Sequence, residues 1–291
     1  VVVSNVVEPD ELPLAQSAAN GMWGAMLLVG AGLGGIVTVV FGRQAAFIVN
    51  AASFLLSAFL LLRIRADLRP RRDASASPSS ASPAVTRSWG ADLRELRNFV
   101  RERPMVARLL TAKPGVGVGN GIVGLLPALS HGRFAAGDWG AGLLLGARGL
   151  GALLGAAVAS RVMEARSLTT AIFRGCALAM FLYAAAYLTM GIVPSIAIAA
   201  VLVLIAHIGG GGQWSLSTVG LQRETPDEIR GRVMSFDYGV ATLAIGVSAL
   251  VAGLLADHLG IATTITALCG AVFVYGLLWS WWSRRELRGA S

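Results

Sequence analysis

The chain has 291 residues, of which 55% are hydrophobic and only 14% are charged, and its mean hydropathy is +0.67. A soluble globular domain carries about 25% charged residues, so most of the surface of this protein must face lipid. The same numbers exclude a disordered chain, a collagen, a coiled coil and a disulfide scaffold, and the net charge of +8 reflects basic residues that gather in the loops of one side.

Long uncharged runs predict eight membrane-spanning helices, because a bilayer core of about 30 Å needs roughly 20 apolar residues in a helix. The clearest run is 45–62, which carries no charge, and it follows another apolar run after the short break 42–44. The uncharged stretch 175–206 is too long for one span, and Gly191 to Pro194 divides it. We therefore expect an all-α polytopic membrane protein with spans near 22–41, 45–62, 105–129, 140–160, 168–190, 195–216, 233–256 and 260–282.

The distribution of arginines predicts how these spans are oriented. Eighteen basic residues lie in alternate loops and at the C-terminus, only Arg43 and Arg133 lie in the opposite loops, and four lie within spans. Because basic residues are retained on the cytoplasmic side, the loop 63–103 and both termini are expected in the cytoplasm. We expect the protein in the plasma (inner) membrane.

The loop between the second and third spans has two parts. The segment 70–88 is rich in Ser, Ala and Pro, which is typical of a disordered linker. After it, Trp89, Leu93, Leu96 and Val100 recur at helical spacing with arginines between them. This pattern predicts an amphipathic helix over 89–103 that lies on the inner leaflet as a spacer at the lipid surface.

An internal repeat divides the chain. Residues 9–11, Pro-Asp-Glu, match residues 226–228 at an offset of 217, and Gly35 and Gly42 match Gly253 and Gly260 at an offset of 218. Both segments lead from the cytoplasm into a span. The repeat predicts two parallel six-span units, of which the first four spans are expected upstream of Val1. Residues 1–64 are then the remnant of the N-terminal half, 65–103 the cytoplasmic linker, and 104–291 the C-terminal half.

Two segments resemble a known family. The loop 221–235 is similar to the loop before helix 11 of major facilitator superfamily exporters, through Gln222, Pro226, Arg230, Gly231 and Arg232, and 47–58 resembles their helix 6. The nearest branch is the group of enterobactin exporters and macrolide-efflux-like proteins. The resemblance implies a major facilitator fold that lacks its first four helices, and secondary active efflux of a small amphipathic molecule, drug-like or siderophore-like, coupled to protons.

A cluster of glycines in the first span is similar to the helix-5 motif of the antiporter branch. Gly30, Gly32, Gly34 and Gly35 can let two helices approach closely at a hinge between the halves. Ala31 stands where that motif has a proline, which weakens the inference of antiport. The face of small residues between Gly142 and Gly155 predicts close packing of the span 140–160 in the same way.

Polar residues within the spans are candidates for lining a cavity, because polar groups in a membrane are costly and usually functional. These candidates are Asn120, Arg148, Gln213 and Trp214. Arg148 lies near mid-membrane and either binds an anionic substrate or holds two helices together. Gly209 to Gly212 predict a bend or unwinding of the helix beside Gln213, whereas His207 is expected to be a packed structural residue.

Lys113 is the only lysine in the chain, and Asp237 lies in a span that neighbours it in the family. The sequence allows a Lys113–Asp237 pair near the cytoplasmic gate, sensitive to protons, which relieves the cost of burying both charges. The alternative is that Lys113 extends to the interface while Asp237 caps the first turn of its helix.

Other functional classes receive no support. The chain shows no Walker loop, HExxH motif, metal-spaced Cys/His cluster or nucleophile–base pair, so we expect no enzyme, cofactor or metal site. Cys176 and Cys269 lie in apolar runs and are expected to be core hydrophobes. The expected partners are the lipid bilayer, a small-molecule substrate and protons, but no nucleic acid. An ABC-type permease with a separate ATPase, or a non-transporting membrane remnant or scaffold, remains open.

Overall fold

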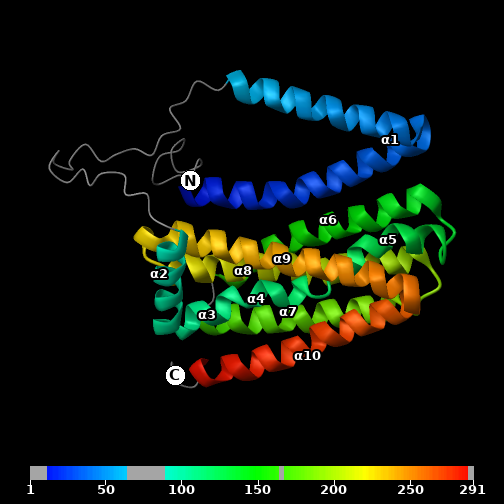
Figure 1. The fold of residues 1–291 in the computed structure, drawn as a ribbon. Coiled ribbons are helices and arrows are strands. Elements are labelled where there is room, and N and C mark those ends of the chain that lie inside the picture. Colours follow the sequence, from blue (N-terminus) through cyan, green and yellow to red (C-terminus); the bar gives the residue numbers. More distant parts are fainter. Residues whose placement is uncertain (1–11, 64–88, 164–166, 288–291) are drawn as a thin grey trace.

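The computed structural model describes residues 12–63, 89–163 and 167–287, and these residues form helices without any strand. The helices run nearly parallel to one another, except for one short helix that crosses the end of the bundle (Figure 1). Their bounds are α1 Leu12–Arg63, α2 Trp89–Glu102, α3 Pro104–Leu110, α4 Ala112–Gly117, α5 Gly121–His131, α6 Gly137–Val162, α7 Leu168–Met190, α8 Ile196–Glu224, α9 Asp227–Leu259 and α10 Ile261–Leu287.

The eight predicted spans correspond to these helices, with α1 supplying two and α3 to α5 together supplying one. In the described part of the chain, seven segments are long and apolar enough to cross a membrane. The prediction of an all-α polytopic membrane protein is confirmed, and so is the division of 175–206, because α7 ends at Met190 and α8 begins at Ile196. The helix α9 begins at Asp227, six residues earlier than predicted.

A sharp reversal at Gly42 folds α1 into a hairpin of two arms, 12–41 and 43–63 (Figure 1). Gly42 has φ 84° and ψ 167°, and Gly260, between α9 and α10, has φ 81° and ψ 159°. Only glycine adopts this region readily, because a Cβ atom would clash with the backbone. The two glycines that match at an offset of 218 therefore make the same turn, each between two long helical segments.

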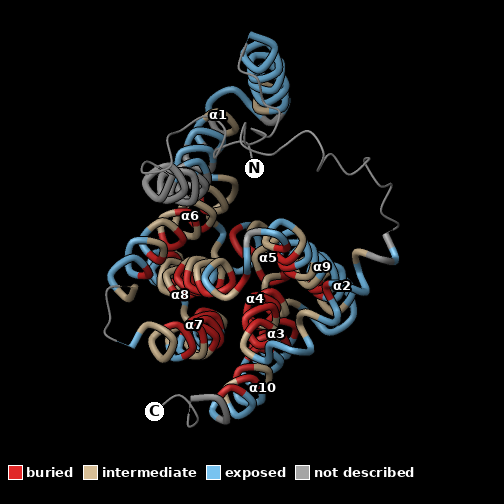
Figure 2. The backbone as a smooth tube through the Cα atoms, turned by 90° about the vertical axis from the view of Figure 1, so that its left-hand side faces the viewer, coloured by how far each residue is buried: buried red, intermediate tan, exposed pale blue. Residues whose placement is uncertain are grey.

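The core of the bundle lies where α3, α4, α7 and α8 face one another (Figure 2). Tyr183, Tyr187 and Met180 of α7 are fully buried there, and both cysteines are buried and unpaired, as the sequence predicted. By contrast, large apolar side chains on the second arm of α1 and on α9 are exposed, including Phe47, Leu62 and Leu243. Such faces are compatible with contact to lipid or to further helices.

Glycines let α6 approach α8 at backbone distance. A Cβ atom on Gly151 would lie 2.3 Å from the carbonyl oxygen of Leu204, and one on Gly155 would lie 2.3 Å from that of Ile208. Both distances are shorter than any tolerable contact, so these positions accept no larger residue without a shift of the helices. The predicted close packing of this span is therefore confirmed at Gly151 and Gly155, whereas Gly146 has open space around it.

The prediction of a bend at Gly209 to Gly212 was wrong, because α8 is one continuous helix from Ile196 to Glu224. These glycines serve close packing instead. A Cβ atom on Gly211 would lie 2.4 Å from the carbonyl oxygen of Ala152, and one on Gly209 would lie 3.1 Å from that of Ala179. Neighbours on α6 and α7 thus support the helix that isolated glycines would weaken.

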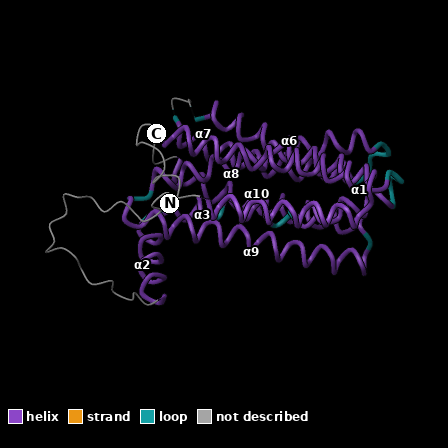
Figure 3. Tube along the Cα trace, turned by 90° about the horizontal axis from the view of Figure 1, so that it is seen from above, coloured by secondary structure: helices purple, strands orange, loops and turns teal. Residues whose placement is uncertain are grey.

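The amphipathic helix predicted for 89–103 is present as α2. It lies across one end of the bundle, roughly perpendicular to the other helices (Figure 3), and this end is called the α2 end below. Leu96 is 6% exposed and packs into the core, while Leu93 remains 51% exposed. The predicted linker 70–88 and the first copy of the Pro-Asp-Glu motif lie outside the described residues.

Candidate functional site

The third span is interrupted in its middle, which the sequence did not predict. The helix α4 ends at Gly117 and α5 begins at Gly121, so residues 118–120 form a turn within the bundle. In a membrane, such a break is tolerated only where other groups satisfy the freed backbone, and broken helices often mark binding sites. The break is therefore the first element of the candidate site.

The hydroxyl of Ser248 on α9 satisfies both sides of this break. It accepts a hydrogen bond from the backbone N–H of Gly121 at 2.9 Å and donates one to the carbonyl oxygen of Val118. A Cβ atom on Gly121 would lie 2.2 Å from the backbone oxygen of Ser248, so glycine permits this approach. The broken span and α9 are thereby fixed to each other.

We expect Ser248→Ala to lower the free energy of unfolding by about 1–3 kcal/mol, because the buried N–H of Gly121 loses its partner. Thr242→Val is the matched control on the same helix, since the Thr242 hydroxyl bonds only to the carbonyl of Tyr238 within α9, at 2.8 Å. Unfolding in a denaturing detergent series measures both. Equal losses in the two variants would contradict the role assigned to Ser248.

Lys113 on α4 and Asp237 on α9 form a buried ion pair, which also joins the third span to α9. The ammonium bonds to the carboxylate oxygen Oδ2, and the two residues are only 4% and 2% exposed. The other carboxylate oxygen, Oδ1, is buried and accepts no hydrogen bond from the described part of the chain. The predicted pairing is confirmed, and the carboxylate retains a free acceptor position.

The alternative arrangement of these two residues was wrong for two physical reasons. Lys113 does not extend to the interface, because it is almost fully buried. Asp237 does not cap its helix, because α9 begins at Asp227 and ten residues carry the chain almost three turns further. A carboxylate at that depth needs a charged partner.

Two aromatic side chains, Trp214 and Tyr238, lie beside the ion pair. The Lys113 ammonium lies 5.1 Å from the centre of the Trp214 ring, a cation–π contact, and Trp214 meets Tyr238 edge to face at 6.1 Å. Trp214 is 36% exposed and Tyr238 is 64% exposed. The aromatic pair therefore separates a buried charge pair from an accessible surface. Trp214 was among the residues proposed from the sequence. Tyr238 was not, although Tyr238 directly follows Asp237 in the chain.

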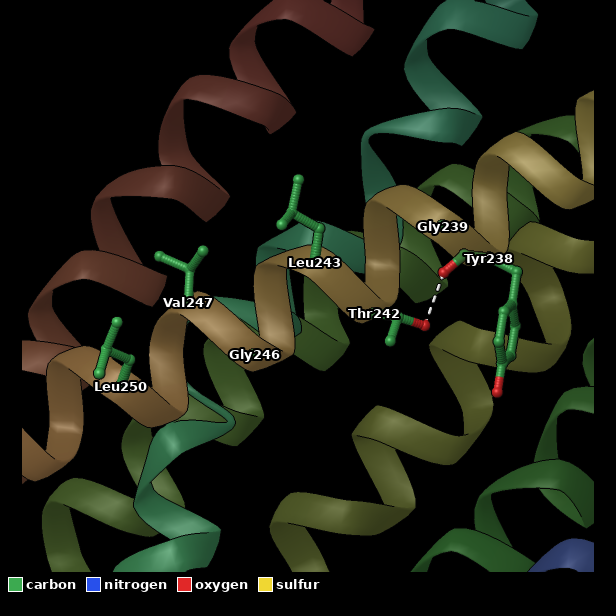
Figure 4. Close-up of a pocket in the computed structure, with 7 residues that line it drawn as sticks. All are labelled: Tyr238, Gly239, Thr242, Leu243, Gly246, Val247 and Leu250. Atoms are coloured by element: carbon green, nitrogen blue, oxygen red, sulfur yellow. Dashed lines mark hydrogen bonds between the residues drawn. The ribbon is translucent and has the colours of Figure 1, made fainter.

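One face of α9, from Tyr238 to Leu250, is an open apolar surface (Figure 4). Gly239 and Gly246, two helical turns apart, leave shallow hollows between its apolar side chains. The other residues of this face are Thr242, Leu243, Val247 and Leu250. An apolar surface thus leads to the aromatic pair and the charges behind it.

The remaining cavity candidates lie in different surroundings. Gln213 is 2% exposed, and its amide donates to the carbonyl oxygen of Ala112 at 2.6 Å, which ties α8 to the start of α4. Asn120 is half-buried in the turn between α4 and α5. Unlike Gln213 and Asn120, Trp214 presents a substantial exposed surface next to the ion pair.

Arg148 belongs to a second polar cluster between α6, α7 and α8. His207 is 5% exposed, and its Nε2 lies 2.9 Å from the hydroxyl of Tyr187. The rings of Tyr183 and Tyr187 pack on each other at 4.8 Å, and the charge of half-buried Arg148 acts on both tyrosines and on His207. The expectation that His207 is a packed residue is confirmed.

The hinge glycines and the loop motif are placed as follows. Nothing lies within 4 Å of a Cβ atom built on Gly30 or Gly34, so neither makes the close helix contact that was predicted, and Gly32 and Gly35 fall outside the residues whose side chains are described.

In the loop motif, Pro226 precedes α9 and Arg230 donates to the carbonyl of Thr225. Half-buried Gln222 lies in the last turns of α8, and exposed Gly231 has open space around it.

Arg232, the last residue of the loop motif, joins α9 to α2. Its guanidinium lies 2.7 Å from a carboxylate oxygen of Glu95 and 3.6 Å from one of Asp92. The sequence placed these acids on an amphipathic helix and the arginine in a family motif, and it gave no indication that they meet.

Comparison with known proteins assigns the family. Residues 1–236 match the Major Facilitator Superfamily, so the chain belongs to this superfamily of membrane transporters. A comparison with curated protein sequences found no match. The fold is similar to the crystal structure of a bacterial homologue of the human lysosomal transporter Spinster, in an inward-facing and unoccupied conformation. The TM-score is 0.64 at 14% sequence identity, over 99% of this chain and 74% of that one.

Proposed function

We propose that this chain forms most of a secondary transporter that exports a small amphipathic molecule in exchange for protons. The superfamily supports a secondary transporter, and it decides against the ABC-type permease that the sequence left open. The observation that carries the finer proposal is the buried Lys113–Asp237 pair, which lies behind the exposed aromatic pair Trp214 and Tyr238.

Asp237 is the proposed proton-binding residue. Its oxygen Oδ2 is held by Lys113, while Oδ1 is buried without a hydrogen bond from the described residues and is available to a proton. Protonation neutralises the carboxylate and removes most of the attraction to Lys113, so it weakens the tie between α4 and α9. Because the pair joins two spans, a proton bound here changes how firmly the spans are held together.

The open apolar face of α9 supports an amphipathic substrate. This face favours an apolar body, and its end at Tyr238 and Trp214 offers aromatic faces next to opposite charges. Binding sites of this kind combine a large apolar surface with a few polar groups that fix orientation. Arg148, Gln213 and Asn120 remain candidates for contacts deeper in the protein.

We also propose the division into an N-terminal remnant at 1–64, a linker at 65–103 and a C-terminal half at 104–291, with the α2 end in the cytoplasm. The support is the matching left-handed geometry of Gly42 and Gly260, which two related halves require. The excess of arginines in alternate loops supports the orientation in the plasma membrane. The glycines at 30–35 stay a proposed hinge between the halves.

A dye-efflux assay tests this function. Cells that express the native gene are loaded with ethidium, an amphipathic cation, or with carboxyfluorescein, an amphipathic anion, and loss of fluorescence is followed with and without a protonophore. We expect one dye to leave faster than from cells with an empty vector, and the protonophore to abolish the difference. Asp237→Asn should abolish it too, whereas Asp257→Asn, an exposed acid on the same helix, should not.

Two outcomes would contradict the proposal. Efflux that persists with the protonophore would remove the coupling to protons, and efflux that survives Asp237→Asn would remove the role of this residue. If neither dye moves although the protein reaches the membrane, the result favours the non-transporting scaffold that the sequence also allowed.

A further inference from the structure

The helix α2 is a firmly attached part of the protein. Leu96 packs into the core, and Arg103, directly after the helix, donates to the carbonyl oxygen of Glu224 at the end of α8, at 3.0 Å. Arg232 on α9 reaches Glu95 at 2.7 Å and Asp92 at 3.6 Å. These contacts hold α2 across the end of the bundle (Figure 1).

Arg232 of α9 pairs with two acidic residues of α2. Asp92 and Glu95 are engaged by an arginine of another helix. The three arginines of α2, Arg94, Arg97 and Arg101, are exposed.

The spacing of the three arginines places them on one side of α2. At 100° per residue, positions 94, 97 and 101 fall within a strip about 60° wide, and the acids lie on the other side of the helix. Leu93, which is 51% exposed, lies between this strip and the buried face that carries Leu96. We call Arg94, Arg97 and Arg101 the arginine strip. An apolar residue next to a row of arginines is the pattern of a helix at a membrane surface.

We propose that the arginine strip is a docking surface for the headgroups of anionic phospholipids. A guanidinium binds a phosphate oxygen pair through two parallel N–H groups, which a zwitterionic headgroup satisfies less well because its own cation competes. The position at the end of the spans and the exposed Leu93 favour a lipid, whose acyl chains contact the apolar side chain while its phosphate contacts the arginines. This inference concerns lipid recognition and does not depend on transport.

Binding of short-chain lipids to the purified chain tests this proposal. A fluorophore is attached at Asn98→Cys, an exposed position on α2 outside the proposed contacts, since both native cysteines are buried. The protein in neutral detergent is titrated with dioctanoyl phosphatidylglycerol or dioctanoyl phosphatidylcholine. Each basic residue near an anionic surface strengthens attraction roughly fivefold, so phosphatidylglycerol should bind at least about tenfold more tightly. Added salt should weaken this preference.

The variant R94Q/R97Q/R101Q should lose the preference for phosphatidylglycerol. The matched control R161Q/R174Q/R223Q removes three exposed arginines elsewhere and changes the net charge equally, and it should keep the preference. Thermal unfolding of both variants confirms that they are folded. Equal binding of the two lipids, an equal loss in the control, or displacement by inorganic phosphate at the same concentration as phosphatidylglycerol would overturn the proposal.

Discussion

Replacing one member of the Lys113–Asp237 pair is expected to destabilise the protein severely. Asp237→Asn leaves the Lys113 ammonium buried without its counter-ion, and Lys113→Met leaves the carboxylate in the same position. Removing one partner of a buried pair costs about 3–5 kcal/mol, because the remaining charge is no longer compensated. Each single variant should therefore unfold at a clearly lower concentration of denaturing detergent than the wild type.

The double variant Lys113→Met/Asp237→Asn distinguishes a true pair from two independent sites. Because both charges are removed, it should be more stable than the sum of the single effects predicts, by about 1–3 kcal/mol. Asp257→Asn and Arg174→Ala, which remove exposed charges from α9 and α7, should each change stability by less than about 0.5 kcal/mol. Additive effects of the two buried substitutions would show that the residues do not interact.

Adding a single methyl group at Gly155 is expected to destabilise the contact between α6 and α8. The new Cβ atom would lie 2.3 Å from the carbonyl oxygen of Ile208 and 2.7 Å from the backbone nitrogen of Gly212, and neither atom can move without the helix. Overpacking of this kind costs about 1–3 kcal/mol. The gain of about 1 kcal/mol in helix propensity from glycine to alanine offsets only part of it.

Gly146→Ala is the control on the same helix, since nothing lies within 4 Å of its added Cβ atom. It should leave stability unchanged or raise it by up to about 1 kcal/mol, so the two alanines are expected to act with opposite signs. Midpoints of unfolding for the purified proteins provide the comparison. If Gly155→Ala were as stable as Gly146→Ala, α6 and α8 would not be packed at backbone distance.

The sequence by itself determined which segments cross the membrane. The apolar runs, the break at Gly191 to Pro194 and the spacing of Trp89, Leu93 and Leu96 predicted helices that the structure contains. These features are local, because the length of a span and the period of a helix depend only on residues that are close along the chain. The loop before α9 and the segment 47–58 also indicated the superfamily, which the family match confirms.

The pairing of Lys113 with Asp237 needed one more step. Two charges in spans imply a partner because burying them separately is costly, and the chain offers few choices within the membrane. The distance of Asp237 from the start of its helix was misjudged, because α9 extends six residues beyond its apolar run to Asp227. The sequence thus predicted the partners, whereas their position relative to the helix end came from the fold.

Only the tertiary structure decided what the glycines do. A glycine weakens a helix, but it also permits a neighbour to approach, and the sequence does not show whether a neighbour is present. Gly209 to Gly212 have α6 and α7 against them and stay helical, whereas Gly117 and Gly121 flank a break whose backbone groups are satisfied by Ser248. Ser248, Tyr238 and Arg232 acquire their roles from residues more than 20 positions away, because packing brings together groups that no local pattern relates.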